Sequence, residues 1–517
     1  MANLEQLARL KQGVRQWNAW RKNNPKIAID LSQVELSDAN LNGVNLRGAN
    51  LSDTYLNGAS LNWADLSETN LRESNLSGAD LKKTNLKIAN LSSANLWVSD
   101  LSEANLSGAN LQGANLWESN LSGANLQGAN LWESNLNGVN FSHADLNEAN
   151  FSNADLSGVN LKEASLNYSN LSQTNLSIAD LSGIDLSRAN FHANNLRGAN
   201  LYRSNLNKID LRGSSLSKAN LNRTDLSGAN LSGVNLSQVT LNSANLRGAD
   251  LSKANLNQAN LCGANLNQAN LCGANLNQAN LRQVKIDSRT QLDRKWKLVW
   301  QILNQENHNL YLIGVDLSQA DLKKARLIRQ DLSHSNLSQV DLSYADLRKS
   351  NLSGVNLWET NLTGANLSQT NFGRVDLSQA SILSRVNLSE SNLSDTNLTG
   401  MDLGYCNLNK VNLKNAILVG TDLYSVDFSQ ADLSQADLTS ANLLKAQLSG
   451  ANLPGATLTG ATITPQMQMD ANTNFDSVIC DYIYLGSRDR RCPRDREQTF
   501  EPGEFSLRIS LGILEEV

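Results

Sequence analysis

The feature that most limits how this chain can fold is a leucine at every fifth position. From Leu31 to Ile286 every fifth residue is Leu, Phe or Ile, which makes 52 consecutive repeats in one register. The residue two positions before it is nearly always small or β-branched, and the residue directly before it is usually Asn or Asp. The repeating unit is therefore Ala-(Asn/Asp)-Leu followed by two variable residues.

A period of five excludes the two common regular structures. On an α-helix five residues advance by about 500°, so the leucines would scatter around the helix without forming an apolar face. On a straight strand an odd period places successive leucines on opposite faces. A chain that turns a corner once per repeat avoids both problems, with Ala and Leu inward, Asn outward and the variable residues at the corner. The sequence therefore predicts an all-β solenoid of stacked coils.

The distribution of proline and of small polar residues agrees with this prediction. None of the five prolines lies between residues 26 and 453, as expected if the backbone there donates hydrogen bonds to neighbouring coils. Asn, Asp, Ser and Gly fill the outward and corner positions, where short polar side chains bond to nearby backbone and glycine accepts unusual dihedral angles.

The repeat resembles the pentapeptide-repeat family, whose members fold as a right-handed quadrilateral β-helix with four repeats per coil. The resemblance implies that the 52 repeats form 13 coils, a rod of about 60 Å at roughly 4.8 Å per coil. Five glutamates recur every fifteen residues: Glu103, Glu118, Glu133, Glu148 and Glu163. A three-sided coil would stack these like charges, which is unfavourable. This argument favours four sides without settling the number, because Arg203 and Arg223 are twenty residues apart.

The chain divides into two repeat blocks with short helical segments. Residues 1–25 are predicted to hold a capping helix, because Leu4, Leu7, Leu10, Val14 and Trp17 follow helical spacing. The same segment resembles the N-terminal extension of many cyanobacterial members of the family. Residues 26–286 form the first repeat block, and residues 287–313 a helical interruption in which Trp296, Val299 and Trp300 share a helix face.

The second repeat block spans residues 314–463. Its repeats run from Leu317 to Ile382, slip by one residue near Leu383, and continue from Leu388 to Ile463. The extra residue predicts a bulge. Residues 464–517 leave the repeat and hold three of the five prolines, so we expect a C-terminal tail, either a solvated charged segment or a docking segment.

Residue types with catalytic or metal-binding chemistry are few and scattered. None of the four histidines, His143, His192, His308 and His334, lies in a pattern typical of metal ligation or nucleophilic catalysis. Glycine-rich phosphate-binding motifs are missing, and the five cysteines show no CxxC spacing. We therefore expect a protein that is not an enzyme, with no catalytic, cofactor-binding or metal-binding residues.

Charge is distributed unevenly over the first block. Residues 100–163, the acidic zone, contain eight acidic residues and one basic residue, a net charge of −7. Residues 188–253, the basic block, contain nine basic and three acidic residues, a net charge of +6. The whole chain has a net charge of only −5.

Tryptophans lie in and beside the acidic zone at corner positions, where the repeat predicts exposure. Trp97 and Trp117 are twenty residues apart, which places them on one side of adjacent coils if four repeats form a coil. Exposed tryptophans are enriched at binding hot spots. We therefore predict a protein-binding surface formed by Trp97, Trp117, Glu118, Trp132 and Glu133. The alternative is that a fifteen-residue unit was duplicated and brought its tryptophan along.

The sequence favours a non-catalytic scaffold or regulatory protein that presents a rigid rod to an unidentified protein partner. The resemblance offers a second function, because some family members inhibit a topoisomerase such as DNA gyrase by mimicking DNA. The positive charge of the basic block argues against such mimicry. Because few aromatic residues lie among its cations, the basic block is also a weak candidate for nucleic-acid binding. We found no membrane span and no signal sequence, so we expect a soluble cytoplasmic protein, from a cyanobacterium by resemblance.

Overall fold

Each five-residue repeat forms one side of a square coil in the computed structural model of the chain. Asn50 pairs in parallel with Asn70, and Asn70 pairs with Asn90, and nearly all backbone bridges of the solenoid likewise join residues twenty positions apart. Twenty residues are four repeats, which confirms the number of sides that the family resemblance implies. The structure describes residues 2–305, 310–373, 375–380, 383, 385–464, 468–487, 490–511 and 514.

The leucines and the small residues before them form the core. Leu51, Leu71 and Leu91 are fully buried, and so is Ala59. Burial of a leucine side chain contributes about 1.5–3 kcal/mol before the entropy cost, and this contribution recurs on every side of every coil. The stability of the solenoid is therefore spread along its length.

The preference for Asn before each leucine has a local cause. The Asn50 Oδ1 accepts a hydrogen bond from the backbone N–H of Ser52 at 3.3 Å, which shapes the corner, and another from the Asn70 side-chain amide at 3.0 Å. The same pattern continues from Asn70 to Asn90. Asp can replace Asn as the acceptor, but it lacks the amide that would donate to the preceding coil.

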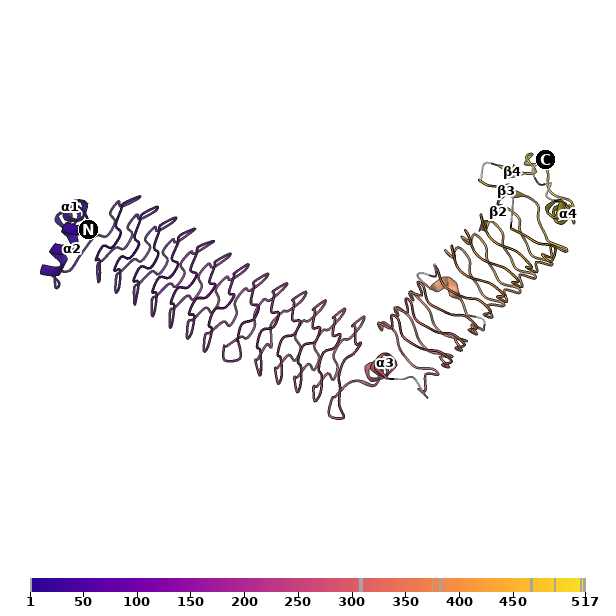
Figure 1. The fold of residues 1–517 in the computed structure, drawn as a ribbon, viewed down its shortest axis with the longest axis horizontal. Helices are drawn as coiled ribbons and strands as arrows, with labels where there is room; N and C mark the ends of the chain where they lie inside the picture. Colours follow the sequence, from indigo (N-terminus) through magenta and orange to yellow (C-terminus); the bar gives the residue numbers. More distant parts are fainter. Residues whose placement is uncertain are drawn as a thin grey trace. The chain divides into compact units, whose positions relative to one another are not determined.

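The chain divides into two compact units, Met1–Asp293 and Arg294–Val517. In the first unit, α1 (Leu4–Lys11) and α2 (Val14–Asn23) precede the coils (Figure 1). The sequence suggested one continuous helix, whereas Gly13, at φ 121°, separates two. Trp17 is fully buried and its Nε1 donates to the Asn45 carbonyl at 2.8 Å, while the Gln6 side chain bonds to the backbone of Ala28 and Asp30. These helices cover the first coil.

The first unit ends one residue out of register. Asn265 pairs with Lys285 at the normal spacing, but Asn270 pairs with Gln291, which is 21 positions along. Ile286, the last member of the sequence repeat, is only half-buried. The coils therefore continue past the boundary at residue 286 that the sequence suggested.

The second unit begins with α3 (Arg294–Asn304), which buries Trp296, Val299 and Ile302. The coils begin at Leu312, which is buried, one repeat earlier than the sequence pattern indicated. Near the slip in the repeat, the short 3₁₀ helix η1 (Leu377–Gln379) replaces a corner, and Asn366 pairs with Asn387, 21 positions along. Leu383 fills the core position there; Ile382, like His308 elsewhere in the chain, lies outside the described residues.

The expected C-terminal tail contains a further coil and a cap. Strands β1 (Asn442–Leu443), β2 (Thr462–Ile463) and β3 (Ile483–Leu485) are parallel neighbours, and β4 (Arg491–Cys492) pairs antiparallel with β3. The final helix, α4 (Glu504–Leu511), buries Phe505 and Ile509. The repeat motif ends near residue 463, but the solenoid does not.

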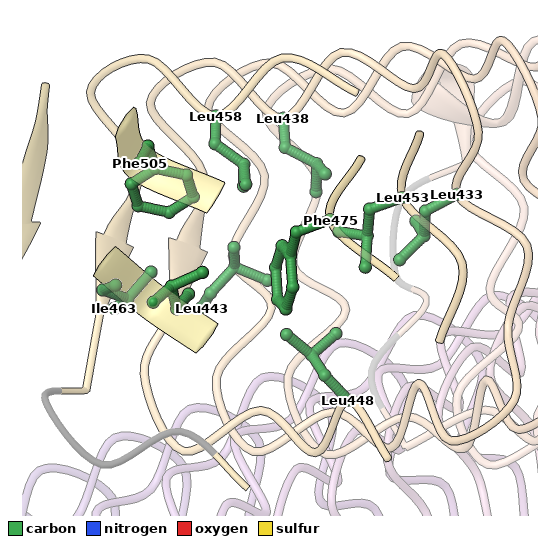
Figure 2. Close-up of a pocket in the computed structure, with 10 residues that line it drawn as sticks. Leu433, Leu438, Leu443, Leu448, Leu453, Leu458, Ile463, Phe475 and Phe505 are labelled. Atoms are coloured by element: carbon green, nitrogen blue, oxygen red, sulfur yellow. The ribbon is translucent and has the colours of Figure 1, made fainter. Parts of the chain in front are cut away.

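Figure 2 shows the core beneath this cap, where Phe475 and Phe505 face the leucines of the last coils. The lining is entirely apolar, and the space left between the side chains is about as large as one water molecule. This cavity is the end of the packed core and is too small for a ligand.

Candidate protein-interaction surface

The outward side chains of the first unit project from the two-residue corners. We call the residue after each core leucine the first corner position and the next residue the second corner position. The second position has a positive φ in almost every repeat, for example 56° at Val98 and 52° at Glu118. Residues twenty positions apart therefore stack into columns that run along the unit's surface.

One column contains the predicted tryptophan pair. The ring centroids of Trp97 and Trp117 are 5.6 Å apart with an interplanar angle of 27°, a stacked arrangement that the twenty-residue spacing predicted. Trp97 is 44% exposed and Val98 beside it is 50% exposed. The Trp117 ring is half-buried, and its Nε1 donates to the Asn137 Oδ1 at 3.0 Å. Exposed apolar surface is concentrated at this corner.

The structure does not bring all five predicted residues together. Glu118 follows Trp117 at the same corner and is exposed. Trp132 and Glu133 lie fifteen residues further, on a different side of the coil, since the bridges in this part of the first unit join residues twenty apart. Trp132 is half-buried and Glu133 is exposed. The predicted set thus divides into a group of three at one corner and a pair at another.

Much of the charge at the edges of the acidic zone is paired within the chain. Lys82 Nζ lies 3.2 Å from Asp100, Lys83 Nζ lies 3.4 Å from Glu103, and the His143 Nδ1 lies 3.2 Å from Glu163. Burial alone would raise the pKa of Asp100, but hydrogen bonds from Ser102 and Lys82 outweigh it and hold that pKa below its usual value. The central glutamates Glu118, Glu133 and Glu148 have no ion pair within the described residues.

The described residues contain no group of three or more His, Cys, Asp or Glu side chains placed to hold a metal ion. All five cysteines are free thiols, of which Cys406, Cys480 and Cys492 are buried. Among the described residues, no helix is both long and apolar enough to cross a bilayer.

The family model for pentapeptide repeats matches residues 29–97, 99–192, 195–287, 311–379 and 381–460, well over half of the chain. The chain belongs to the pentapeptide-repeat family. Membership implies that the quadrilateral β-helix is right-handed. It also confirms the resemblance that the sequence motif suggested. A search of the curated proteins found no match.

Several solved pentapeptide-repeat structures are similar to this protein. HetL, from the cyanobacterium Nostoc sp. strain PCC 7120 and involved in heterocyst differentiation regulation, is 30% identical over 53% of this chain and 98% of HetL, with a TM-score of 0.23. Rfr23, from the cyanobacterium Cyanothece 51142, is 37% identical over 20% of this chain and 63% of Rfr23, with a TM-score of 0.11. QnrB1, a plasmid-mediated fluoroquinolone resistance protein, is 20% identical over 36% of this chain and 92% of QnrB1, with a TM-score of 0.27.

Other exposed apolar residues of this pentapeptide-repeat protein escaped the sequence analysis. Trp63 is 66% exposed at another corner, where Lys83 Nζ lies 4.7 Å from its ring centroid. Ile178 is 76% exposed and belongs to the same column as Trp97 and Trp117. Once four repeats per coil are established, a search at multiples of twenty residues from Val98, the second position of that corner, would have found Ile178, which lies eighty residues further along.

Proposed function

We propose that this pentapeptide-repeat protein is a non-catalytic scaffold or regulatory protein, and that a protein partner binds the corner formed by Trp97, Val98, Trp117 and Glu118. The observation that supports this proposal is the stacked indole pair, in which Trp97 is exposed and Trp117 is half-buried. Exposed aromatic side chains held in place by their neighbours lose little entropy on binding, which is why they dominate binding hot spots. The coil fixes the two rings because their backbones are hydrogen-bonded to one another: Val98 N–H donates to the Trp117 carbonyl at 2.9 Å.

Trp132 and Glu133 form the second part of the proposed surface. They repeat the Trp-Glu pair of Trp117 and Glu118 on the next corner back along the coil. A partner that contacts both corners would wrap around an edge of the acidic zone. If the pair is a by-product of sequence duplication instead, its removal will leave binding unchanged.

The experiment that tests this proposal is affinity capture with the full-length tagged protein from an extract of its native organism. The Trp97→Ser/Trp117→Ser variant is expected to lose the partner recovered by the wild type. Trp63→Ser is the matched control, because Trp63 is more exposed but lies at another corner. An unchanged set of captured proteins with the double variant would rule out this surface, and Trp132→Ser then tests the second corner separately.

Inhibition of a topoisomerase is the second function that the family suggests. A DNA mimic needs negative charge along its length, whereas here eight acids in the acidic zone give way to nine cations in the basic block. A supercoiling assay with purified DNA gyrase and a quinolone tests this function directly. We expect the protein to have no effect on gyrase activity or on its inhibition.

A further inference from the structure

The tryptophan pair is part of a column of corner residues that runs along the first unit. We call the seven coils of this column from Trp97 to Lys218 the tryptophan corner; it consists of residues 97–98, 117–118, 137–138, 157–158, 177–178, 197–198 and 217–218. Backbone hydrogen bonds of 2.9–3.0 Å join each step, from Val98 N–H to the Trp117 carbonyl through to Gly198 N–H to the Ser217 carbonyl. The column is therefore one continuous edge of the first unit.

The two ends of the tryptophan corner carry opposite charge. Glu118 lies beside the indole pair, and Arg197 and Lys218 lie four and five coils further along. All three side chains are exposed. Within the described residues none of them takes part in an ion pair, in contrast to Arg212, which is paired with Asp210 at 2.7 Å. These charges are available to a molecule that approaches the corner.

The tryptophan corner is complementary to the same corner of a second copy that runs in the opposite direction. A twofold axis placed at Gly158 would bring Ile178 of one copy opposite Gly138 of the other, one coil from the axis on each side. Two coils from the axis, Arg197 would lie opposite Trp117 and Glu118. Three coils from the axis, Lys218 would lie opposite Val98. At roughly 4.8 Å per coil, the contact would extend about 15 Å on either side of the axis.

Shape supports the same register. Ile178 is the most exposed apolar side chain of the corner at 76%. Gly138 and Gly158 have no side chain; the Glu118 Cγ lies 3.2 Å from where a Cβ of Gly138 would be, so the room for an isoleucine from a second copy lies between Gly138 and Gly158. Gly158 has no side-chain atom of the protein within 4 Å of where its Cβ would lie. Because a twofold contact is formed twice, each of these pairings would count double.

The arrangement of charges along the tryptophan corner favours a second copy of this chain as the partner over an unrelated protein. A partner for this corner needs a cation opposite Glu118 and Trp117, an acid opposite Arg197, and an apolar residue between the two glycines, spaced by whole coils. The tryptophan corner itself, read in the opposite direction, meets all three requirements. A guanidinium placed over an indole and beside a carboxylate gains from both cation–π attraction and charge pairing.

We propose that the protein forms an antiparallel homodimer along the tryptophan corner, with Arg197 of each copy bound against Trp117 and Glu118 of the other. This inference uses the same indole pair as the proposed function but does not require it. In a cell the dimer would cover Trp97 and Trp117, so a heterologous partner would bind there only by displacing the second copy.

Sedimentation velocity of the purified full-length protein tests the dimer. We expect the wild type to dimerise at micromolar concentration in 50 mM salt and to dissociate more readily in 500 mM salt. Glu118→Arg and Arg197→Glu should each weaken dimerisation about tenfold or more, and the double variant Glu118→Arg/Arg197→Glu should restore it. Glu148→Arg and Lys208→Glu are the matched controls, because they make the same charge changes at another corner and should leave the dimer unchanged.

A disulfide trap tests the register. With the accessible Cys262 and Cys272 replaced by Ser, Ser157→Cys places a thiol next to the proposed axis, and oxidation should give a covalent dimer. Ser237→Cys lies four coils further along the same column, beyond the tryptophan corner, and should not give a covalent dimer. Three results would each overturn the proposal. The wild type could stay monomeric at 100 µM protein, both single charge reversals could leave the dimerisation constant unchanged, or the double variant could fail to restore dimerisation.

The two proposals fail in different ways. Arg197→Glu alters the dimer but leaves Trp97 and Trp117 in place, so capture of a heterologous partner should persist or increase. Trp97→Ser/Trp117→Ser should abolish capture whether or not the protein dimerises. Loss of the dimer with Arg197→Glu while capture is retained agrees with both proposals. A monomeric wild type that captures a partner through Trp97 and Trp117 overturns only the dimer, whereas a dimeric wild type whose captured proteins do not change in Trp97→Ser/Trp117→Ser overturns only the docking surface.

Discussion

At the scale of single residues, the second corner position makes the strongest demand on the backbone. The left-handed conformation there costs glycine nothing, whereas β-branched side chains adopt it at a penalty. Ile88, Val98 and Ile178 nevertheless have φ values of 58°, 56° and 61°. Their side chains are also exposed, so burial does not compensate for the strain.

Replacement of Ile88 by Gly should therefore stabilise the first unit. Ile88 is 58% exposed, so little buried surface is lost, and relief of the left-handed strain should raise the free energy of unfolding by about 1 kcal/mol. Thermal denaturation measures the change as an increase in Tm. Lys87→Gly, at the neighbouring corner position, is the control and should lower Tm. A decrease with Ile88→Gly would show that the corner imposes no strain.

The thiols should differ sharply in reactivity. Burial raises the pKa of Cys406 to about 11, and its Sγ donates to the Leu383 carbonyl at 3.2 Å. Cys272 is exposed. A thiol reagent at pH 8 should therefore modify Cys272 within the dead time and Cys406 only after denaturant is added. Cys272→Ser should remove the contribution of Cys272 to the fast phase and leave that of the half-buried Cys262. Rapid modification of Cys406 in the native protein would contradict its buried position.

At the scale of one side of the solenoid, the outward carboxylates predict a dependence of stability on pH. Asp100 accepts from the Ser102 N–H at 3.0 Å, from the Asn120 amide at 3.2 Å and from Lys82. Its folded pKa lies below the unfolded value of about 3.9. The stabilisation is therefore complete above about pH 4 and is lost as pH falls through the lower folded pKa.

We accordingly expect Tm to be constant from about pH 7 to pH 5 and to fall below about pH 4. Asp100→Asn keeps a side-chain oxygen that can accept from the Ser102 backbone N–H and removes the titrating group. This variant should therefore show a smaller loss of Tm between about pH 5 and pH 2. Differential scanning calorimetry over this range measures both curves. If Tm falls by the same amount in wild type and variant, Asp100 contributes nothing to the loss of stability at acid pH.

The N-terminal helices should be essential for covering the open end of the first unit. Trp17 is fully buried and bonds to the Asn45 carbonyl, so Trp17→Ala should cost about 3–5 kcal/mol. The exposed edge of the first coil would then promote association. We expect a lower Tm and aggregates in light scattering. Trp20→Ala is the control because Trp20 is only half-buried; equal effects of the two changes would argue against the cap.

Sequence reasoning succeeded where one rule is repeated many times and failed where the rule is broken once. The stack of Trp97 on Trp117 follows from the coil period alone. The break between α1 and α2 at Gly13 was missed because apolar spacing continues across the glycine. The additional coil after residue 463 was missed because Phe475, Cys480 and Leu485 keep the five-residue spacing but are two residues out of register with Ile463, so that its bridges join residues 22 positions apart, such as Thr462 and Tyr484.

At the scale of the whole molecule, different residues of a repeat protein determine the fold and the surface. Most sides of the coils are built from the same kinds of Leu and Asn contacts, so the core can form whichever repeats stack on one another. The columns of corner residues, in contrast, depend on which repeats stack. Removal of one repeat shifts all later corner residues by one side while the core contacts reform unchanged.

Deletion of Ser102–Leu106 should therefore leave a folded protein with a different surface. Trp117 would then follow Trp97 by fifteen residues in place of twenty, so the two rings would lie on different sides and their stack would be lost. The far-UV circular dichroism spectrum should be retained, and the near-UV signal of the coupled indoles should disappear together with partner capture.

Deletion of Ser122–Leu126, which follows both tryptophans, is the control. The indole signal should persist in this variant. The dimer should dissociate, because Glu118 and Arg197 no longer lie at the same corner. A persistent indole signal after the first deletion would mean that the four-sided register does not set the surface.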